Sequence, residues 1–225
     1  MMRYLWGATP RFPFQPDGYW PGAGPAPYST RQVGLLAFTG VVVSLFGLFT
    51  AAYLMRISYE DWRVLPPVPW QLWLSTGLLV ASDAVWVLAV RAARRRERVP
   101  ALRLAGAGWL LALTFVASQL GAWQAMVAQQ VGITAGPAAG FFYMLTGLHG
   151  LHVIGGVVAA GWVLAKGLAQ GGADAGVLHL GDGLALCARY WHLLLGLWLA
   201  LFALLFWMTP EMVRAICASV GIPVR

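Results

Sequence analysis

Residues 138–164 read AAGFFYMLTGLHGLHVIGGVVAAGWVL and contain no Asp, Glu, Lys or Arg. A helix needs about 20 apolar residues to cross a hydrocarbon core of about 30 Å, so this stretch is predicted to span a membrane. A strand of a membrane β-barrel would instead alternate polar and apolar residues over about ten positions. Because this stretch is apolar on nearly every face, the fold is expected to be helical and embedded in lipid.

The composition of the whole chain also indicates a membrane protein. Of its 225 residues 60% are hydrophobic and 10% are charged, and the mean hydropathy is +0.69. Soluble domains carry about 25% charged residues, so a soluble globule is not expected. A chain this apolar does not fit the composition of a disordered protein, and two cysteines do not make a disulfide scaffold. The net charge of +7 comes largely from arginines that cluster beside apolar runs. Such clustering is a topology signal, so no nucleic-acid partner is expected.

Four more stretches share this character, and the chain is predicted to be an all-α, polytopic bundle of five transmembrane helices. Prolines or Gly-Pro pairs separate the spans or follow the last one. The predicted spans are residues 33–55, 70–90, 104–127, 138–164 and 184–208. They define a transmembrane domain of residues 33–209, preceded by an N-terminal arm of residues 1–32 and followed by a short C-terminal tail of residues 210–225.

The N-terminal arm contains six prolines interleaved with large aromatic residues such as Trp6, Phe12 and Phe14. So many prolines prevent both a regular helix and a sheet ladder. No apolar segment follows the first residues, so no cleavable signal peptide is predicted. Two interpretations remain open, a solvated disordered leader and an extended arm along a partner subunit. We favour the second because a solvated leader has little use for large aromatic side chains.

Basic residues near the span ends predict the orientation. Six arginines lie around the connection between the second and third spans, namely Arg91, Arg94, Arg95, Arg96, Arg98 and Arg103. Positively charged loops stay in the cytoplasm, so the N-terminus is expected inside and the C-terminus outside the cell membrane of a bacterium. Cys187 and Cys217 then lie on opposite sides of the membrane, and neither a disulfide nor a zinc framework is expected.

Polar residues inside the spans are the candidate functional residues, because ionisable groups are costly in lipid. They are Asp83, Gln119, His149, His152 and His192. His149 and His152 are three apart and share one helix face, where they could ligate haem or copper or relay protons. No other span offers a histidine near mid-membrane, so structural histidines that hydrogen-bond across helices are favoured. No nucleotide loop, nucleophile with its base or CxxC pair occurs, and no catalytic, cofactor or metal residue is predicted.

The depth of Asp83 predicts its partner. Both the second and the fourth span run inward, and Asp83 lies at nearly the same depth as His149. We therefore expect a carboxylate oxygen of Asp83 within about 2.6–3.2 Å of His149 or His152. Small residues in the fourth span should allow close helix contact. The packing glycines are Gly147, Gly150, Gly155 and Gly156.

The run FFYMLTGLHGLHV at residues 141–153 closely resembles the TG-x-HG-x-HV signature of subunit III of haem-copper oxidases. That family includes cytochrome c oxidases, quinol oxidases and a nitric-oxide-reductase-associated member. Four further segments resemble the family in the same order: AAYLMR at 51–56, LSTGLL at 74–79, QLGAW at 119–123 and YWH at 190–192. The resemblance covers roughly residues 33–208 and corresponds to the five-span bacterial form.

The chain departs from this family at its usual carboxylates. Val42 stands near the position of the glutamate in the first shared helix, and Ala122 replaces the glutamate of the Q-x-x-E motif. Leucines follow His192 where the family has an acid. Roles attached to those carboxylates therefore do not carry over, and Asp83 is a candidate replacement acid.

The resemblance implies an accessory subunit in aerobic respiratory electron transport that has no haem or copper of its own. It would pack against subunit I, which holds those cofactors, in a complex with subunit II. It would also bind phospholipid in a cleft and support proton uptake and sustained turnover. The complex, rather than this chain, would reduce O2 to water and translocate protons, with cytochrome c or quinol as electron donor. Other hypotheses are the nitric-oxide-reductase-associated relative, a membrane enzyme with its own haem, and a transporter, for which no convincing inverted repeat is found.

Overall fold

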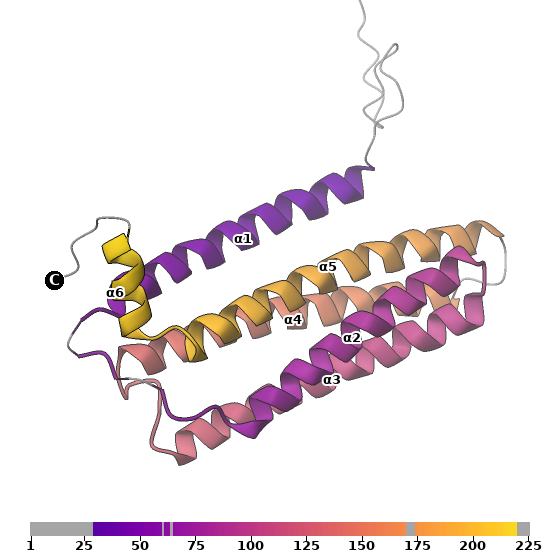
Figure 1. Cartoon of the computed structure of the whole chain (residues 1–225). Helices are drawn as coiled ribbons and strands as arrows, with labels where there is room; N and C mark the ends of the chain where they lie inside the picture. Colours follow the sequence, from indigo (N-terminus) through magenta and orange to yellow (C-terminus); the bar gives the residue numbers. More distant parts are fainter. Residues whose placement is uncertain (1–28, 60, 64, 170–173, 220–225) are drawn as a thin grey trace, which may run out of the picture.

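The computed structural model describes residues 29–59, 61–63, 65–169 and 174–219, and in these ranges every regular element is a helix. In chain order they are α1 (Thr30–Arg56), α2 (Trp70–Arg94), α3 (Arg98–Ala128), α4 (Pro137–Ala169), α5 (Asp174–Phe206) and α6 (Pro210–Ser219) (Figure 1). The first five helices each contain a stretch long and apolar enough to cross a membrane, which in α5 is Leu180–Phe206. The predicted all-α fold with five spans is confirmed.

The long helices extend beyond the predicted apolar stretches. For example, α2 continues to Arg94 and α3 begins at Arg98. Hydropathy marks only the part of a helix that lies in hydrocarbon, whereas backbone hydrogen bonding continues into the interface. Within the C-terminal tail the structure has the short helix α6, which the sequence analysis did not predict. Residues 1–28 of the N-terminal arm lie outside the described residues, and so does the prediction about its course.

A capping box explains why α1 begins at Thr30. The backbone N–H of Gln32 donates to Ser29 Oγ at 3.3 Å, and the backbone N–H of Ser29 donates to Gln32 Oε1 at 3.1 Å. The two side chains thereby satisfy donors that have no partner within the helix.

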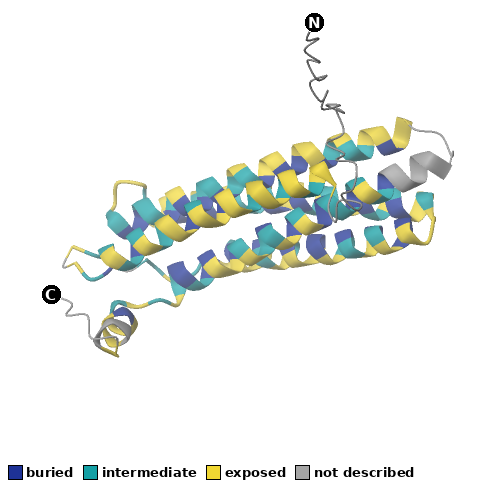
Figure 2. Cartoon of the chain, turned by 90° about the horizontal axis from the view of Figure 1, so that it is seen from above, coloured by how far each residue is buried: buried dark blue, intermediate teal, exposed yellow. Residues whose placement is uncertain are grey.

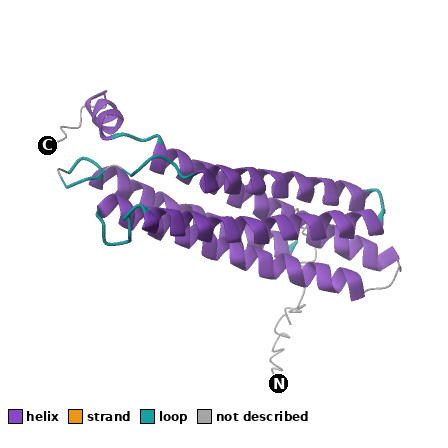
Figure 3. Ribbon diagram, turned by 90° about the horizontal axis from the view of Figure 1, so that it is seen from below, coloured by secondary structure: helices purple, strands orange, loops and turns teal. Residues whose placement is uncertain are grey.

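In the bundle α2 and α3 form one closely packed pair of helices, and α4 and α5 form another. α2 lies along α3, and α5 lies along both α2 and α4 (Figure 1). Figure 3 shows the long helices running side by side. α1 packs mainly against α4 and α5, and 11% of its apolar window is buried against 39% for α5. Figure 2 shows buried residues gathered on the inward faces of the helices. Thus α5 is the central element, and α1 flanks the remaining helices.

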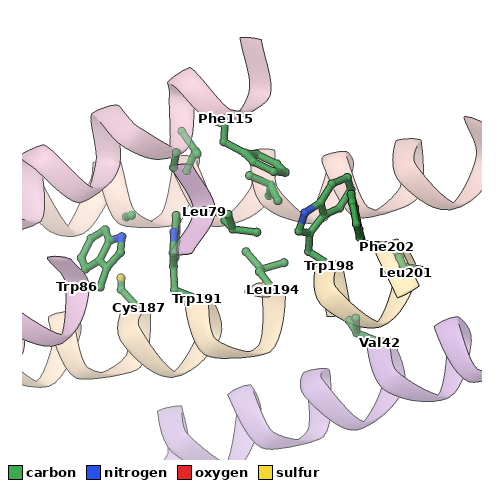
Figure 4. Close-up of a cluster of buried hydrophobic side chains, with 14 of the residues drawn as sticks. Val42, Leu79, Trp86, Phe115, Cys187, Trp191, Leu194, Trp198, Leu201 and Phe202 are labelled. Carbon is green, nitrogen blue, oxygen red and sulfur yellow. The ribbon is translucent and has the colours of Figure 1, made fainter. Parts of the chain in front are cut away.

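Large aromatic side chains fill the core between α2, α3 and α5 (Figure 4). Trp86 and Trp191 lie with ring centroids 5.1 Å apart, and Phe115 meets Trp198 edge to face at 5.6 Å. All four residues are buried. Because lipid chains are as apolar as the core, close packing and aromatic geometry hold these helices together rather than exclusion from water.

Candidate functional site

Asp83 pairs with His192, not with a histidine of α4. Asp83 Oδ1 lies 2.7 Å from His192 Nδ1, which joins the middle of α2 to the middle of α5. The predicted contact between Asp83 and His149 or His152 is therefore wrong. Matching depth restricts the possible partners of a residue, but which helices are neighbours decides the choice, and α2 packs mainly against α3 and α5.

The Asp83–His192 contact is an ion-pair geometry rather than a well-aligned hydrogen bond. The two atoms are close, yet Asp83 Oδ1 has no hydrogen-bond partner of acceptable angle among the described residues. The Asp83 side chain is 13% exposed and that of His192 is 53% exposed. The pair thus has one buried member and one member that faces out of the bundle.

His149 lies in the aromatic core without a hydrogen bond. Its ring meets Phe115 edge to face at a centroid distance of 6.0 Å and lies 5.4 Å from the ring of Trp198. Neither ring nitrogen has a hydrogen-bond partner among the residues the structure describes. The hydrogen bond across helices predicted for His149 is therefore not made within this part of the chain.

His152 faces α1 rather than the core. Its ring lies 6.2 Å from that of Phe38 and 5.7 Å from that of Phe46. Its Nδ1–H donates to the carbonyl oxygen of Leu148 at 2.8 Å, which is a bond within α4 and not the predicted one to another helix. Although they are only three residues apart, the two histidines of α4 have different neighbours.

Hydroxyl groups of α2, which sequence reasoning missed, join the helices. Ser82 Oγ donates to the carbonyl oxygen of Gly108 at 2.9 Å and accepts from Trp191 Nε1 at 2.9 Å. Gln119 Nε2 donates to Ser75 Oγ at 2.8 Å, so the predicted polar residue of α3 contacts α2. The available sequence signal was a set of hydroxyls and tryptophans at corresponding depths in different spans.

The predicted packing glycines divide into two groups. A Cβ added to Gly156 would lie 2.8 Å from Tyr190 Cε1, and one added to Gly147 would lie 3.4 Å from Trp123. A Cβ added to Gly150 or Gly155 would meet nothing within 4 Å in the described chain. Among these four positions, an added Cβ would have to displace a neighbouring ring at Gly156, whereas at Gly147 it would make an ordinary contact.

The positions that lack the family's glutamates are apolar parts of the core. Val42 and Ala122 are both buried. Val42 lies one helical turn from Phe38 and from Phe46, on the face of α1 that meets His152. No group of three or more His, Cys, Asp or Glu in the described part of the chain is arranged to hold a metal ion. Cys187 is a free, buried thiol.

An apolar groove lies between α1, α4 and α5. It has a volume of about 490 Å³, and its walls include Phe38, Gly156, Trp162 and Tyr190. Arg31 belongs both to this groove and to two smaller hollows at the end of the bundle where α1 begins. Those hollows are also lined by Lys166, Asp182 and Arg189. The groove therefore combines an apolar body with a predominantly basic mouth.

These features define a polytopic helical membrane protein whose intramembrane polar groups mainly join helices to one another. The match to a family model is more specific and covers residues 62–210. The chain belongs to the cytochrome c oxidase subunit III family. Members of this family generally carry no haem or copper, which other subunits hold. The resemblance inferred from the sequence motifs is confirmed.

Individual relatives agree with the family match. The chain is 29% identical to a probable cytochrome c oxidase subunit 3 of Nocardia farcinica, covering 78% of this chain and 86% of the relative. It is also 29% identical to the cytochrome c oxidase subunit 3 of Thermostichus vulcanus, over 80% and 88% of the two chains. A cytochrome bo(3) ubiquinol oxidase subunit 3 of Pseudomonas aeruginosa is 24% identical over 60% and 63%.

Proposed function

We propose that this chain is a non-catalytic accessory subunit of a terminal haem-copper oxidase in a bacterial inner membrane, where it packs against subunit I in a complex with subunit II. The observation that carries the proposal is where the residues of the family signature lie. Phe142, Thr146, His149 and Val153 of the signature are buried in the bundle. The signature thus serves packing within the subunit, as suits a subunit whose complex holds the redox centres elsewhere.

The groove between α1, α4 and α5 is proposed to bind a phospholipid. Its apolar walls suit acyl chains, and the basic residues at its mouth suit a phosphate-bearing headgroup. Lys166 Nζ also lies 3.6 Å from the centre of the Trp162 ring, which places an aromatic and a cationic side chain together at the mouth, as at a membrane interface. A lipid held here would fill the groove and stabilise the loosely packed α1.

Through these contacts the subunit would support proton uptake and sustained turnover, while subunit I reduces O2. Purification from native membranes through a tag on this chain tests the assignment. A haem-bearing oxidase subunit should co-purify, and deletion of the chain should leave initial O2 reduction but shorten the time for which it is sustained. Purification of the chain without such a partner, or a stoichiometric Soret band in the isolated chain, would refute the proposal. A partner that reduces nitric oxide would identify the related complex instead.

The lipid proposal has its own test. The double variant Arg31→Gln, Lys166→Gln should lose phospholipid that the wild-type complex retains through detergent exchange, measured by native mass spectrometry. Arg214→Gln, at the other end of the bundle, is the matched control and should retain it. Equal lipid retention in both variants would contradict a headgroup site at the mouth of the groove.

A further inference from the structure

The Asp83–His192 pair lies near the middle of both spanning helices, so the expectation that no span besides the fourth has a histidine near its middle is wrong for α5. Asp83 is 13 residues after the start of its span at Trp70 and 11 before its end at Arg94. His192 is 12 residues after Leu180 and 14 before Phe206, the ends of its span. At about 1.5 Å per residue, both side chains are more than 15 Å from either end of their helices. Neither end of the two helices is within reach of a short imidazole.

The exposure of His192 is unusual at such a depth. Ionisable side chains inside membranes almost always face protein or a water-filled cavity. His149 is 1% exposed, as this rule expects, but the side chain of His192 is 53% exposed. Arg189, one turn away, has a long side chain that can extend toward the interface, whereas His192 cannot. The surface that carries His192 is therefore unsuited to lipid and suited to protein.

Apolar residues surround His192 on this surface. Val80 precedes Asp83 by three positions on α2, and Leu195 and Leu199 follow His192 by three and seven positions on α5, so each shares a helix face with the pair. Val80 and Leu199 are each 45% exposed. We call Val80, His192, Leu195 and Leu199 the α2–α5 face. Figure 1 shows α5 running between α2 and α1, so this face differs from the groove between α1, α4 and α5.

We propose that the α2–α5 face docks a transmembrane helix of another oxidase subunit, and that this helix presents a hydroxyl or amide side chain to His192 Nε2. Nδ1 faces Asp83 Oδ1 at 2.7 Å, so Nε2 is the nitrogen left for a partner. A hydroxyl or an amide can donate to a neutral imidazole or accept from a protonated one. Lipid acyl chains offer neither group. The inference rests on the proposed function, because it requires that the chain assembles with other membrane-spanning subunits.

Photo-crosslinking in the intact complex tests which face is covered. A benzoylphenylalanine placed at Val80 or Leu199 should form adducts with a peptide of another oxidase subunit. Leu110 of α3, which is 58% exposed, is the control position and should form lipid adducts. Adducts at Val80 and Leu199 that contain only lipid or a second copy of this chain would overturn the proposal. Equal yields of subunit adducts at all three positions would do so as well.

Substitution of His192 tests the polar contact. His192→Leu should lower retention of this chain on the haem-bearing subunit about tenfold in a detergent titration, because it removes a buried hydrogen-bonding group. His192→Gln keeps such a group and should restore most of the retention. Thermal unfolding of the isolated subunit checks that both variants fold alike. Equal retention of both variants would overturn the proposed contact. If the wild-type chain fails to co-purify, the proposed function itself fails, whereas wild-type co-purification without the predicted adducts removes only this inference.

Discussion

At the scale of single residues, Gly156 permits a close side-chain approach between α4 and α5. An added Cβ would lie 2.8 Å from Tyr190 Cε1 and 3.1 Å from Trp191 Cζ3. Neither ring moves easily, since Tyr190 Oη donates to the carbonyl oxygen of His152 at 3.0 Å and Trp191 is fully buried. The absence of a side chain at Gly156 therefore sets the local spacing of the two helices.

Gly156→Ala should destabilise the bundle by about 1–3 kcal/mol, because the extra methyl group overpacks this contact. Reversible unfolding in mixed detergent micelles measures the change. The matched control is Gly150→Ala in the same helix, where a Cβ meets nothing within 4 Å. That variant should stay within about 0.5 kcal/mol of wild type. A Gly156→Ala protein as stable as the control would show that the rings shift at little cost.

Asp61 lies outside the spans and provides a titratable contact. Arg56 Nη1 donates to Asp61 Oδ1 at 2.6 Å, and this hydrogen bond lowers the pKa of Asp61 below its ordinary value. A lowered folded-state pKa favours the ionised carboxylate, so the stabilisation exists above the ordinary pKa of Asp and is lost as pH falls through the lowered one. Arg56→Gln should therefore raise the pKa of Asp61 toward about 3.9. Titration of ¹³C-labelled aspartate by NMR measures this pKa, and an unchanged value would contradict the contact.

At the scale of elements, one hydroxyl links three helices. Ser82 of α2 bonds to Gly108 of α3 and to Trp191 of α5. Both contacts are buried, and lipid offers no replacement for a lost partner, so Ser82 satisfies polar groups of two neighbouring helices at once.

Ser82→Ala should destabilise the bundle by about 1–3 kcal/mol, since it leaves the Trp191 indole N–H and the Gly108 carbonyl without this partner. Thr114→Ala is the control, because the exposed Thr114 hydroxyl donates to the carbonyl oxygen of Leu110 in its own helix at 2.9 Å. Its effect should remain within about 0.5 kcal/mol. Tryptophan fluorescence during unfolding follows both variants, and equal effects would argue against a linking role for Ser82.

α2 and α3 end in the same backbone motif, and in each a residue other than glycine has the left-handed conformation. Gln130 follows the C-cap of α3 with φ of 61°, its N–H donates to Val127, and the N–H of Val131 donates to Met126. Arg96 occupies the equivalent place after α2 with the same φ. This is the Schellman arrangement, in which glycine is normally preferred.

Gln130→Gly should stabilise the protein by about 0.5–1 kcal/mol, because glycine adopts the left-handed conformation without the steric penalty of a Cβ. The thermal midpoint of the purified subunit measures the gain. A conservative comparison is Gln130→Ala, which keeps the Cβ and should bring no such gain. A lower midpoint for the glycine variant would show that the Gln130 side chain makes a compensating contact.

At the scale of the whole molecule, the orientation predicted from basic residues remains to be tested. A reporter fused after Arg225 should read as periplasmic, and one inserted at residues 94–98 should read as cytoplasmic. This orientation places the basic mouth of the groove on the cytoplasmic side, where anionic lipid is attracted to arginine and lysine. The opposite reporter pattern would overturn both the orientation and the side on which the headgroup is proposed to bind.

The whole molecule also presents two distinct surfaces along α5. On one side α1, α4 and α5 enclose the apolar groove, and on the other α2 and α5 carry His192. A lipid on the first surface and a protein partner on the second would leave the central helix covered along both sides. The tests of the two surfaces are independent because they concern different residues.

The number of spans and the family could be predicted from the sequence alone, because lipid requires long apolar helices and because the motif at residues 141–153 is specific. The sequence also identified Asp83 and His192 as functional candidates, since ionisable residues are rare in spans. Their pairing was not, because residue depth does not say which helices are neighbours. Only the tertiary structure placed α2 beside α5, left His149 among aromatic rings and showed that Gly156 rather than Gly150 lies at a close contact. Such choices depend on how side chains interlock between helices, which hydropathy and spacing along one chain do not encode.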